Sequence, residues 1–97
     1  MKSVLIVHNQ VLGTELLRML DELKIRGFTQ WNTVQGRGGN DGEPRMGTHT
    51  WPELNGALLC VVEDDVSQQL LARIREMDEA APEQGLRAFV WTIDETS

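Results

Sequence analysis

Hydrophobic residues along the chain occur either in short continuous runs or at helical spacing. Residues 4–7 and 57–62 are continuous apolar runs, which are typical of strands covered on at least one face. Within residues 11–25 the apolar positions recur at steps of three and four, as on one face of an amphipathic helix. The same spacing returns within residues 66–77 and predicts a second helix that continues to about Ala80.

Local signals suggest where these helices begin and end. Asn9 or Thr14 is a candidate start for the first helix, and Gly27 is a candidate end because glycine tolerates the left-handed backbone of a C-terminal cap. Asp64 or Asp65 is a candidate N-cap for the second helix, since its side chain accepts hydrogen bonds from the first free amides.

Two segments of mixed polarity complete the order of elements. Residues 28–34 have aromatic and β-branched residues among polar ones, as in a strand with one exposed face, and residues 87–93 form the last strand. Pro52 and Gly56 indicate that regular pairing of the third strand begins after them. The order strand–helix–strand thus occurs twice. Two such units most often form an α+β ferredoxin-like βαββαβ plait, a four-stranded antiparallel sheet with two helices on one face.

One face of such a sheet carries no helices. Large side chains that alternate onto this face, with Trp31 and Trp91 as candidates, need cover, and self-association is the usual way to supply it. Trp51 stands apart from them beside Pro52. It either anchors the end of the preceding loop or contacts a partner.

The two halves are joined by a long insertion at about residues 36–52, which is rich in glycine and has little to bury apart from Met46. Structureless loops longer than about 12–15 residues are uncommon in compact domains and are usually functional or disordered. We therefore expect the loop to contact a ligand or a partner. Gly36 and Gly38 suit either a phosphate cradle or a flexible linker. The segment is neither a Walker A loop nor a dinucleotide fingerprint, because no lysine–serine/threonine pair and no helix follow.

Composition and charge narrow the class of function. A chain of 97 residues fits one domain, and its formal charge of −6 disfavours general binding to nucleic acids or to anionic membranes. No apolar run is long enough for a signal-peptide core or a membrane span, so we expect a cytoplasmic protein that does not itself enter the membrane. Cys60 is the only cysteine and lies in an apolar run, which predicts a buried thiol and no intramolecular disulfide.

No group of residues points to catalysis. The carboxylates of residues 63–65 resemble an acid–base pair, but the helix that follows needs its first amides capped. Nothing in the sequence suggests a serine–histidine–aspartate triad, so we expect a protein that is not an enzyme. His8 and His49 are too far apart in the sequence for a compact metal motif.

Four segments, taken in order, resemble the PII signal-transduction proteins and their divergent PII-like relatives. Residues 27–29 resemble the glycine–apolar–threonine that begins the family's second strand, and residues 34–38 resemble its entry into the T-loop. Residues 61–65 resemble its junction of strand and helix, and residues 87–90 resemble the strand after its B-loop. The match covers nearly the whole chain, so the resemblance implies one PII-like domain over residues 1–97.

The resemblance also implies a homotrimer with nucleotide sites in the clefts between subunits, at the base of the T-loop. Residues 27–29 would approach the base of the nucleotide, the glycines would let the backbone approach phosphates, and the arginines would supply charge. The ligand would be a nucleotide such as ATP, ADP or AMP. The ligand-binding residues implied in this way are Gly27, Phe28, Thr29, Gly36, Arg37, Gly38 and Arg87.

The chain departs from the family pattern in three places. Residues 80–85 are shorter than the family's B-loop and lack its threonine–glycine–lysine stretch, and Glu83 would repel phosphate. Residues 93–97 are acidic where the family has two arginines. The T-loop is shorter, and the chain has no tyrosine to be modified. These departures argue against the family's standard ATP/ADP binding, 2-oxoglutarate sensing and tyrosine uridylylation.

Three functions remain open. The first is a PII-like regulatory protein that binds a nucleotide-like effector and, through residues 37–50, a partner such as a transporter or an enzyme. The second is a divalent-metal-responsive trimer, because the related CutA trimers share the fold and are associated with divalent metals. In that case His49, with Glu43 or Asp41, would bind the metal across a subunit boundary. The third is a purely protein-binding module.

Overall fold

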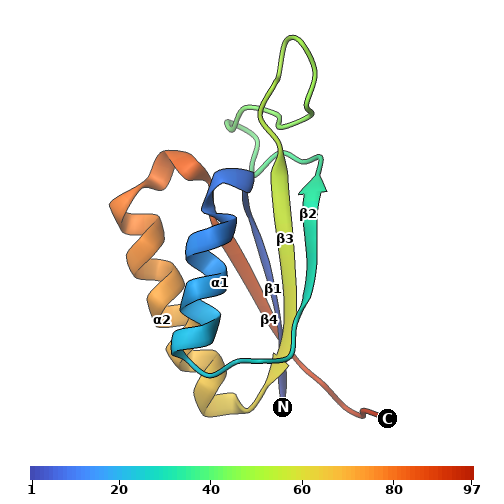
Figure 1. Cartoon of the computed structure of the whole chain (residues 1–97), viewed down its shortest axis with the longest axis vertical. Coiled ribbons are helices and arrows are strands. Elements are labelled where there is room, and N and C mark those ends of the chain that lie inside the picture. The colour runs from blue at the N-terminus through green and yellow to red at the C-terminus, as the bar shows by residue number, and fades with distance from the viewer.

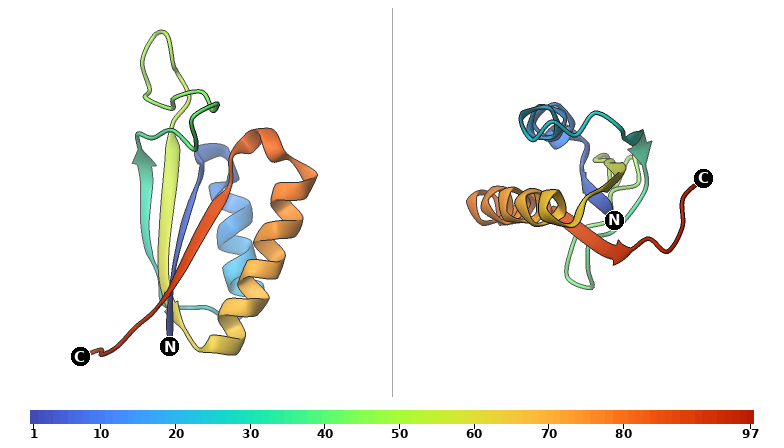
Figure 2. Two further views of the ribbon diagram at one scale, coloured as in Figure 1. Left: turned by 180° about the vertical axis from the view of Figure 1, so that it is seen from behind. Right: turned by 90° about the horizontal axis from the view of Figure 1, so that it is seen from below.

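The computed structural model describes residues 1–97, and its elements follow the predicted order (Figure 1). The four strands form one antiparallel sheet in the order β2–β3–β1–β4, and both helices lie on one face of it (Figure 2). The predicted α+β ferredoxin-like plait is confirmed. None of the helices is both long enough and apolar enough to span a membrane. The elements are β1 (Lys2–Asn9), the 3₁₀ turn η1 (Gln10–Leu12), α1 (Gly13–Glu22), β2 (Thr29–Val34), β3 (Asn55–Val62), α2 (Asp64–Ala80), the 3₁₀ turn η2 (Pro82–Gln84) and β4 (Arg87–Thr92).

The hydrophobic core lies between the sheet and the two helices. Alternate residues of the central strands β1 and β3 point to the helices, and they pack against the apolar stripes of α1 and α2. Burial of each large aliphatic side chain contributes about 1.5–3 kcal/mol. Cys60 is in this core, as predicted, and burial raises the pKa of its thiol. The core residues are Val4, Ile6, Leu16, Met19, Leu20, Ile25, Leu58, Cys60, Val62, Leu70, Ile74 and Leu86.

The predicted end of the first helix is wrong. Helix α1 ends at Glu22, five residues before Gly27, and the residue in the left-handed region is Lys24, with φ 61°. The amide of Ile25 donates to the carbonyl of Leu20 at 2.8 Å, and this turn carries the Ile25 side chain into the core. Burial of Ile25 thus ends the helix early. A Cβ on Gly27 would meet nothing within 4 Å, so no close contact requires glycine there.

The predicted cap of the second helix is also wrong. The N-cap residue is Glu63, whose side chain makes no capping hydrogen bond. Asp64 and Asp65 lie inside the first turn, where their charges favour the positive end of the helix dipole. Asp64 Oδ1 also lies 3.3 Å from the exposed amino group of Met1, a surface ion pair of the kind that contributes little.

The third strand begins earlier than predicted, because Gly56 is part of it. In the register of β1 and β3, Gly56 lies opposite His8, and a Cβ on Gly56 would be 2.7 Å from His8 Cε1. The glycine therefore makes room for an imidazole that is only 2% exposed. His8 Nδ1 donates to the carbonyl of Asn9 at 2.6 Å, while Nε2 is buried without a partner. Burial lowers the pKa of His8, and the hydrogen bond to Asn9 opposes this only in part.

The sheet face without helices is apolar and uncovered. Leu5 pairs with Leu59 on one side and with Phe89 on the other, so one row of large side chains crosses the three strands. Trp31 and Trp91 lie on the same face and are 45% and 47% exposed. The predicted placement of both tryptophans on this face is confirmed. An apolar face of this kind is expected to associate with another copy of the chain.

Replacement of Trp91 by glutamate should therefore reduce self-association. If this face is buried between subunits, a carboxylate on it would lose its hydration, so we expect Trp91→Glu to shift the protein from an oligomer toward a monomer. Size-exclusion chromatography with light scattering measures this mass. Val11→Glu is the matched control, because Val11 is 71% exposed but lies on η1, away from this face. A monomeric parent protein, or equal masses for Trp91→Glu and the parent, would contradict the expectation.

His8 should make stability depend on pH. The pKa of His8 in the folded state lies below the unfolded value of 6.5, so the unfolded chain binds the proton more readily. The stabilisation is complete above about pH 6.5 and is lost as the pH falls from there toward the lowered pKa. Thermal melts between about pH 7.5 and pH 5 should therefore show a decline that His8→Gln flattens. His49→Gln, in the exposed loop, is the control and should decline like the parent.

Candidate functional site

The long loop between β2 and β3 is divided into two turns by short backbone contacts. At its base Gly36 and Arg45 exchange two hydrogen bonds, Gly36 N to Arg45 O at 2.9 Å and Arg45 N to Gly36 O at 2.6 Å. Beyond this bridge the amide of Gly47 donates to the carbonyl of Glu53 at 3.1 Å and closes a second turn. Figure 1 shows the two turns above the sheet. The segment predicted as structureless thus has a defined base.

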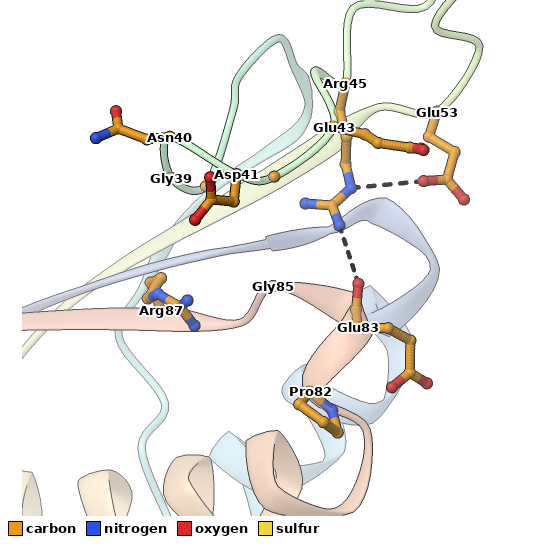
Figure 3. A pocket seen from close by; sticks show the side chains of 12 residues that line it. Gly39, Asn40, Asp41, Glu43, Arg45, Glu53, Pro82, Glu83, Gly85 and Arg87 are labelled. Carbon is orange, nitrogen blue, oxygen red and sulfur yellow. Dashed lines mark hydrogen bonds and ion pairs between the residues drawn. The ribbon is translucent and has the colours of Figure 1, made fainter.

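Arg45 holds this base together with its side chain. The residue is only 8% exposed, which is rare for arginine. Its Nη1 donates to Asn55 Oδ1 at 3.2 Å, and its Nη2 donates to the carbonyl of Glu83 at 3.5 Å. Its Nε lies 3.6 Å from Glu53 Oε2, an ion pair too long for a hydrogen bond (Figure 3). One guanidinium therefore joins the loop, the start of β3 and the turn before β4.

A polar pocket of about 610 Å³ lies beside Arg45. Its volume is within the range of small-molecule sites. The first turn of the loop forms one wall and the segment around η2 forms the other, so a ligand in the pocket would touch both (Figure 3). Apart from the ring of Pro82, no apolar side chain lines it. The lining residues are Gly38, Gly39, Asn40, Asp41, Gly42, Glu43, Arg45, Glu53, Pro82, Glu83, Gly85 and Arg87.

The charges of the pocket do not simply favour an anion. Four carboxylates and two guanidinium groups are among the lining residues. Arg87 has a side chain that is 51% exposed, and its Nη1 lies 3.8 Å from Asp78 Oδ1. Glu83 turns its backbone carbonyl toward Arg45 while its carboxylate points away (Figure 3). The electrostatic attraction for a phosphate therefore depends on Arg45, Arg87 and the backbone amides of the glycine-rich turn, of which that of Gly42 already donates to Gly39 O at 3.2 Å.

Two of the residues that the sequence predicted for ligand binding, Gly38 and Arg87, line this pocket. Gly36 lies at the bridge instead, where a Cβ would be 2.9 Å from Asn55 Nδ2. Close packing against β3 thus requires a glycine at position 36 whether or not a ligand is bound. The part of these residues in binding a ligand stays a prediction.

Arg37 does not face the pocket, although the resemblance suggested a charged contact there. Its Nε donates to the carbonyl of Gly42 at 2.6 Å, and its Nη2 donates to the carbonyl of Asn40 at 3.0 Å. The side chain folds back over its own turn and fixes the shape of that wall. In the free chain Arg37 is therefore a structural residue of the loop.

Gly27, Phe28 and Thr29 lie at the other end of the sheet. Thr29 begins β2 and the loop follows its last residue, Val34, so the length of the strand separates them from the pocket (Figure 1). One chain does not bring these residues to the pocket. The cleft between subunits that the resemblance implies would need the next subunit to supply them.

The predicted metal ligands are not assembled within one chain. Asp41 and Glu43 line the pocket, whereas His49 belongs to the second turn and does not. No group of three histidine, cysteine, aspartate or glutamate side chains is placed to hold a metal ion. A metal site across a subunit boundary stays an untested prediction.

Sequence reasoning missed Arg45, Asn55 and Gly85 as site residues. Gly85 has φ 65°, a left-handed conformation that glycine adopts without strain. A Cβ at this position would lie 3.0 Å from Arg45 Nη1, so the absence of a side chain leaves room for the guanidinium. No local pattern marks Arg45, because two of its partners are 10 and 38 residues away. The sequence drew attention to residues 80–85 only as a short counterpart of the family's B-loop, and it did not indicate that they contact Arg45.

The profile of the family Nitrogen regulatory protein P-II matches residues 1–97. A protein of Thermus thermophilus described as PII-like is 27% identical, with a TM-score of 0.66 over 93% of this chain and 83% of that chain. A comparison with curated protein sequences finds no significant match.

CPII, a nitrogen regulatory PII-like protein from Thiomonas intermedia, is also similar in structure. Its complex with ADP, AMP and bicarbonate is 18% identical, with a TM-score of 0.75 over 93% of this chain and 82% of that chain. Its apo form is 16% identical, with a TM-score of 0.70 over 93% of this chain and 85% of that chain. At this identity the likeness to CPII shows a shared fold.

The close packing at the base of the loop predicts that alanine substitutions at two glycines of the loop change stability by different amounts. In Gly36→Ala the new Cβ would clash with Asn55, which is 2% exposed and cannot move freely, so we expect a loss of about 1–3 kcal/mol in the free energy of unfolding. In Gly39→Ala the new Cβ would meet nothing within 4 Å, and stability should change little. Urea unfolding measures both. Equal stabilities of the two variants would show that the bridge does not hold the loop.

Proposed function

The chain belongs to the P-II family, and we propose that it is a PII-like regulatory protein that binds a nucleotide-like effector and signals it to a partner protein through the loop. The P-II family forms trimers and regulates rather than catalyses. In the proposed homotrimer the effector binds in the clefts between subunits, where the pocket of one chain meets residues 27–29 of the next. The proposal includes no enzymatic activity.

One observation carries the proposal. The polar pocket is formed jointly by the loop and by the turn before β4, so its ligand contacts the segment that would signal to a partner. Gly38, Gly39 and Gly42 present backbone to the pocket without side chains, which suits the close approach of a phosphate. Arg45 and Arg87 supply positive charge from the opposite walls.

Adenine nucleotides are the first ligands to test. CPII of Thiomonas intermedia was solved with ADP and AMP bound, and it shares the fold of this chain. The carboxylates of the pocket favour a ligand of lower charge, because repulsion from Asp41 and Glu43 grows with each added phosphate. We therefore expect ADP or AMP to bind more tightly than ATP.

The second turn of the loop is the proposed contact for a partner, such as a transporter or an enzyme. Its residues extend beyond the end of the sheet (Figure 1). Thr48 N donates to Trp51 O at 2.9 Å and Trp51 N donates to Thr48 Oγ1 at 3.1 Å, so the backbone of Trp51 is fixed while its indole is 37% exposed. An exposed tryptophan on an ordered turn is a common anchor at protein interfaces. No comparable observation favours the metal-responsive alternative.

Isothermal titration of the full chain with ADP, AMP and ATP tests the proposal. We expect ADP and AMP to bind more tightly than ATP, and Arg87→Ala to weaken ADP binding by about tenfold, because a charged hydrogen bond to phosphate is lost. Arg18→Ala is the matched control, since Arg18 is exposed on α1 and does not line the pocket. The absence of binding by all three nucleotides at millimolar concentration would overturn the nucleotide proposal.

A further inference from the structure

Arg45 carries the most deeply buried charge of the pocket. Its contacts do not satisfy all of its hydrogen-bond donors. Its two neutral partners, Asn55 Oδ1 and the carbonyl of Glu83, lie at 3.2 and 3.5 Å. Its Nε has no hydrogen-bond partner although the residue is 8% exposed. A buried charged donor without an acceptor is costly, so such a group is expected to have a further partner in a functional state.

We propose that Arg45 is the anion-binding residue of the pocket and that a phosphate of the nucleotide binds its guanidinium in place of Glu53. The inference rests on the proposed function for the identity of the ligand. It adds a binding residue that neither the sequence pattern nor the family resemblance indicated, and it adds a mechanism by which the bound nucleotide acts on the loop.

Glu53 is suited to be displaced. Its side chain is 61% exposed, and its Oε2 lies 3.6 Å from Arg45 Nε, so water screens the pair and no hydrogen bond is lost when it separates. A phosphate carries more charge than a carboxylate and accepts two parallel hydrogen bonds from a guanidinium. Asn55 and Glu83 would keep their neutral contacts and hold the guanidinium in position for this exchange.

The resemblance indicated Arg87 as the phosphate contact, but Arg87 is expected to attract a phosphate less strongly than Arg45 does. Its side chain is 51% exposed, and Nη1 donates to the carbonyl of Leu86 at 2.9 Å. An exposed guanidinium stays hydrated, so its attraction for a phosphate is weaker than that of a buried one. Arg87 therefore adds to binding as an exposed charge on one wall, while Arg45 supplies the buried charge on the opposite wall.

The exchange would transmit binding to the second turn of the loop. The backbone carbonyl of Glu53 accepts the hydrogen bond from Gly47 that closes this turn, and the side chain of Glu53 ties the same residue to Arg45. When the phosphate releases that side chain, the turn loses one of its ties to the body of the protein, while Gln35 Nε2 still donates to Met46 O and Gln10 N still donates to Leu54 O, each at 2.9 Å. Nucleotide binding and loosening of the turn that carries Trp51 are then linked, and the linkage acts in both directions.

Titration of the full chain with ADP tests whether Glu53 competes with the phosphate for Arg45 or only adds to the negative charge of the pocket. In Glu53→Gln the competing carboxylate is gone, so ADP should bind about threefold to fivefold tighter than to the parent. Glu43→Gln is the matched control, because it removes the same charge from the same pocket, but Glu43 makes no ion pair or hydrogen bond with the Arg45 side chain. We expect a smaller gain in Glu43→Gln. Adenosine, which has no phosphate, should not distinguish the variants.

Two further measurements probe Arg45 and the loop. Arg45→Lys keeps the charge but loses the planar fork, so it should weaken ADP binding by at least about tenfold, with folding checked by circular dichroism. Hydrogen exchange followed by mass spectrometry reports on the Gly47 amide. ADP should speed its exchange in the parent, and in Glu53→Gln exchange should already be fast without ADP.

The outcomes distinguish the inference from the proposed function. If the parent binds ADP but Glu53→Gln binds it no tighter than Glu43→Gln does, Glu53 does not compete with the phosphate and the inference is wrong, while the nucleotide proposal stands. If neither the parent nor Glu53→Gln binds ADP, AMP or ATP at millimolar concentration, both are wrong. Because this comparison does not need an Arg45 variant, it holds even if Arg45→Lys fails to fold.

Discussion

Burial of the Arg45 guanidinium is the constraint that shapes the upper end of this molecule. A buried charge must have polar partners, and the partners of Arg45 come from the end of the loop, the start of β3 and the turn before β4. The same residue forms the backbone bridge with Gly36. The base of the loop, the beginning of a central strand and the wall of the pocket are therefore parts of one arrangement.

This arrangement explains why the pocket is polar and why it lies where it does. The aliphatic core occupies the space between sheet and helices and ends below the loop. At the end of β1 and β3 nearest the loop, the buried residues include His8, Asn9 and Asn55, and Arg45 contacts Asn55 there. The hydrogen bonds of Arg45 to Asn55 and to the carbonyl of Glu83 hold the loop against the sheet and the turn before β4. The pocket is the space that stays open between the loop and that turn.

The chain also shows how a family scaffold can keep its geometry while its chemistry changes. Residues 80–85 are short and carry Glu83, but they still approach the loop, because the carbonyl of Glu83 and the left-handed Gly85 accommodate Arg45. The resemblance placed positive charge on Arg37 and Arg87. In the structure Arg37 closes its own turn, Arg87 is half exposed, and the buried charge is that of Arg45.

The sequence by itself determined the order of the elements, the sheet with helices on one face, the buried Cys60 and the exposed tryptophans of the open face. These features follow from periods of two and of three to four residues, which near neighbours in the chain encode. Only the tertiary structure decided the early end of α1, the room that Gly56 leaves for His8, and the pocket around Arg45. Each of these depends on residues that are distant in the sequence or on a buried contact, and no local pattern records which distant partner a buried side chain will meet.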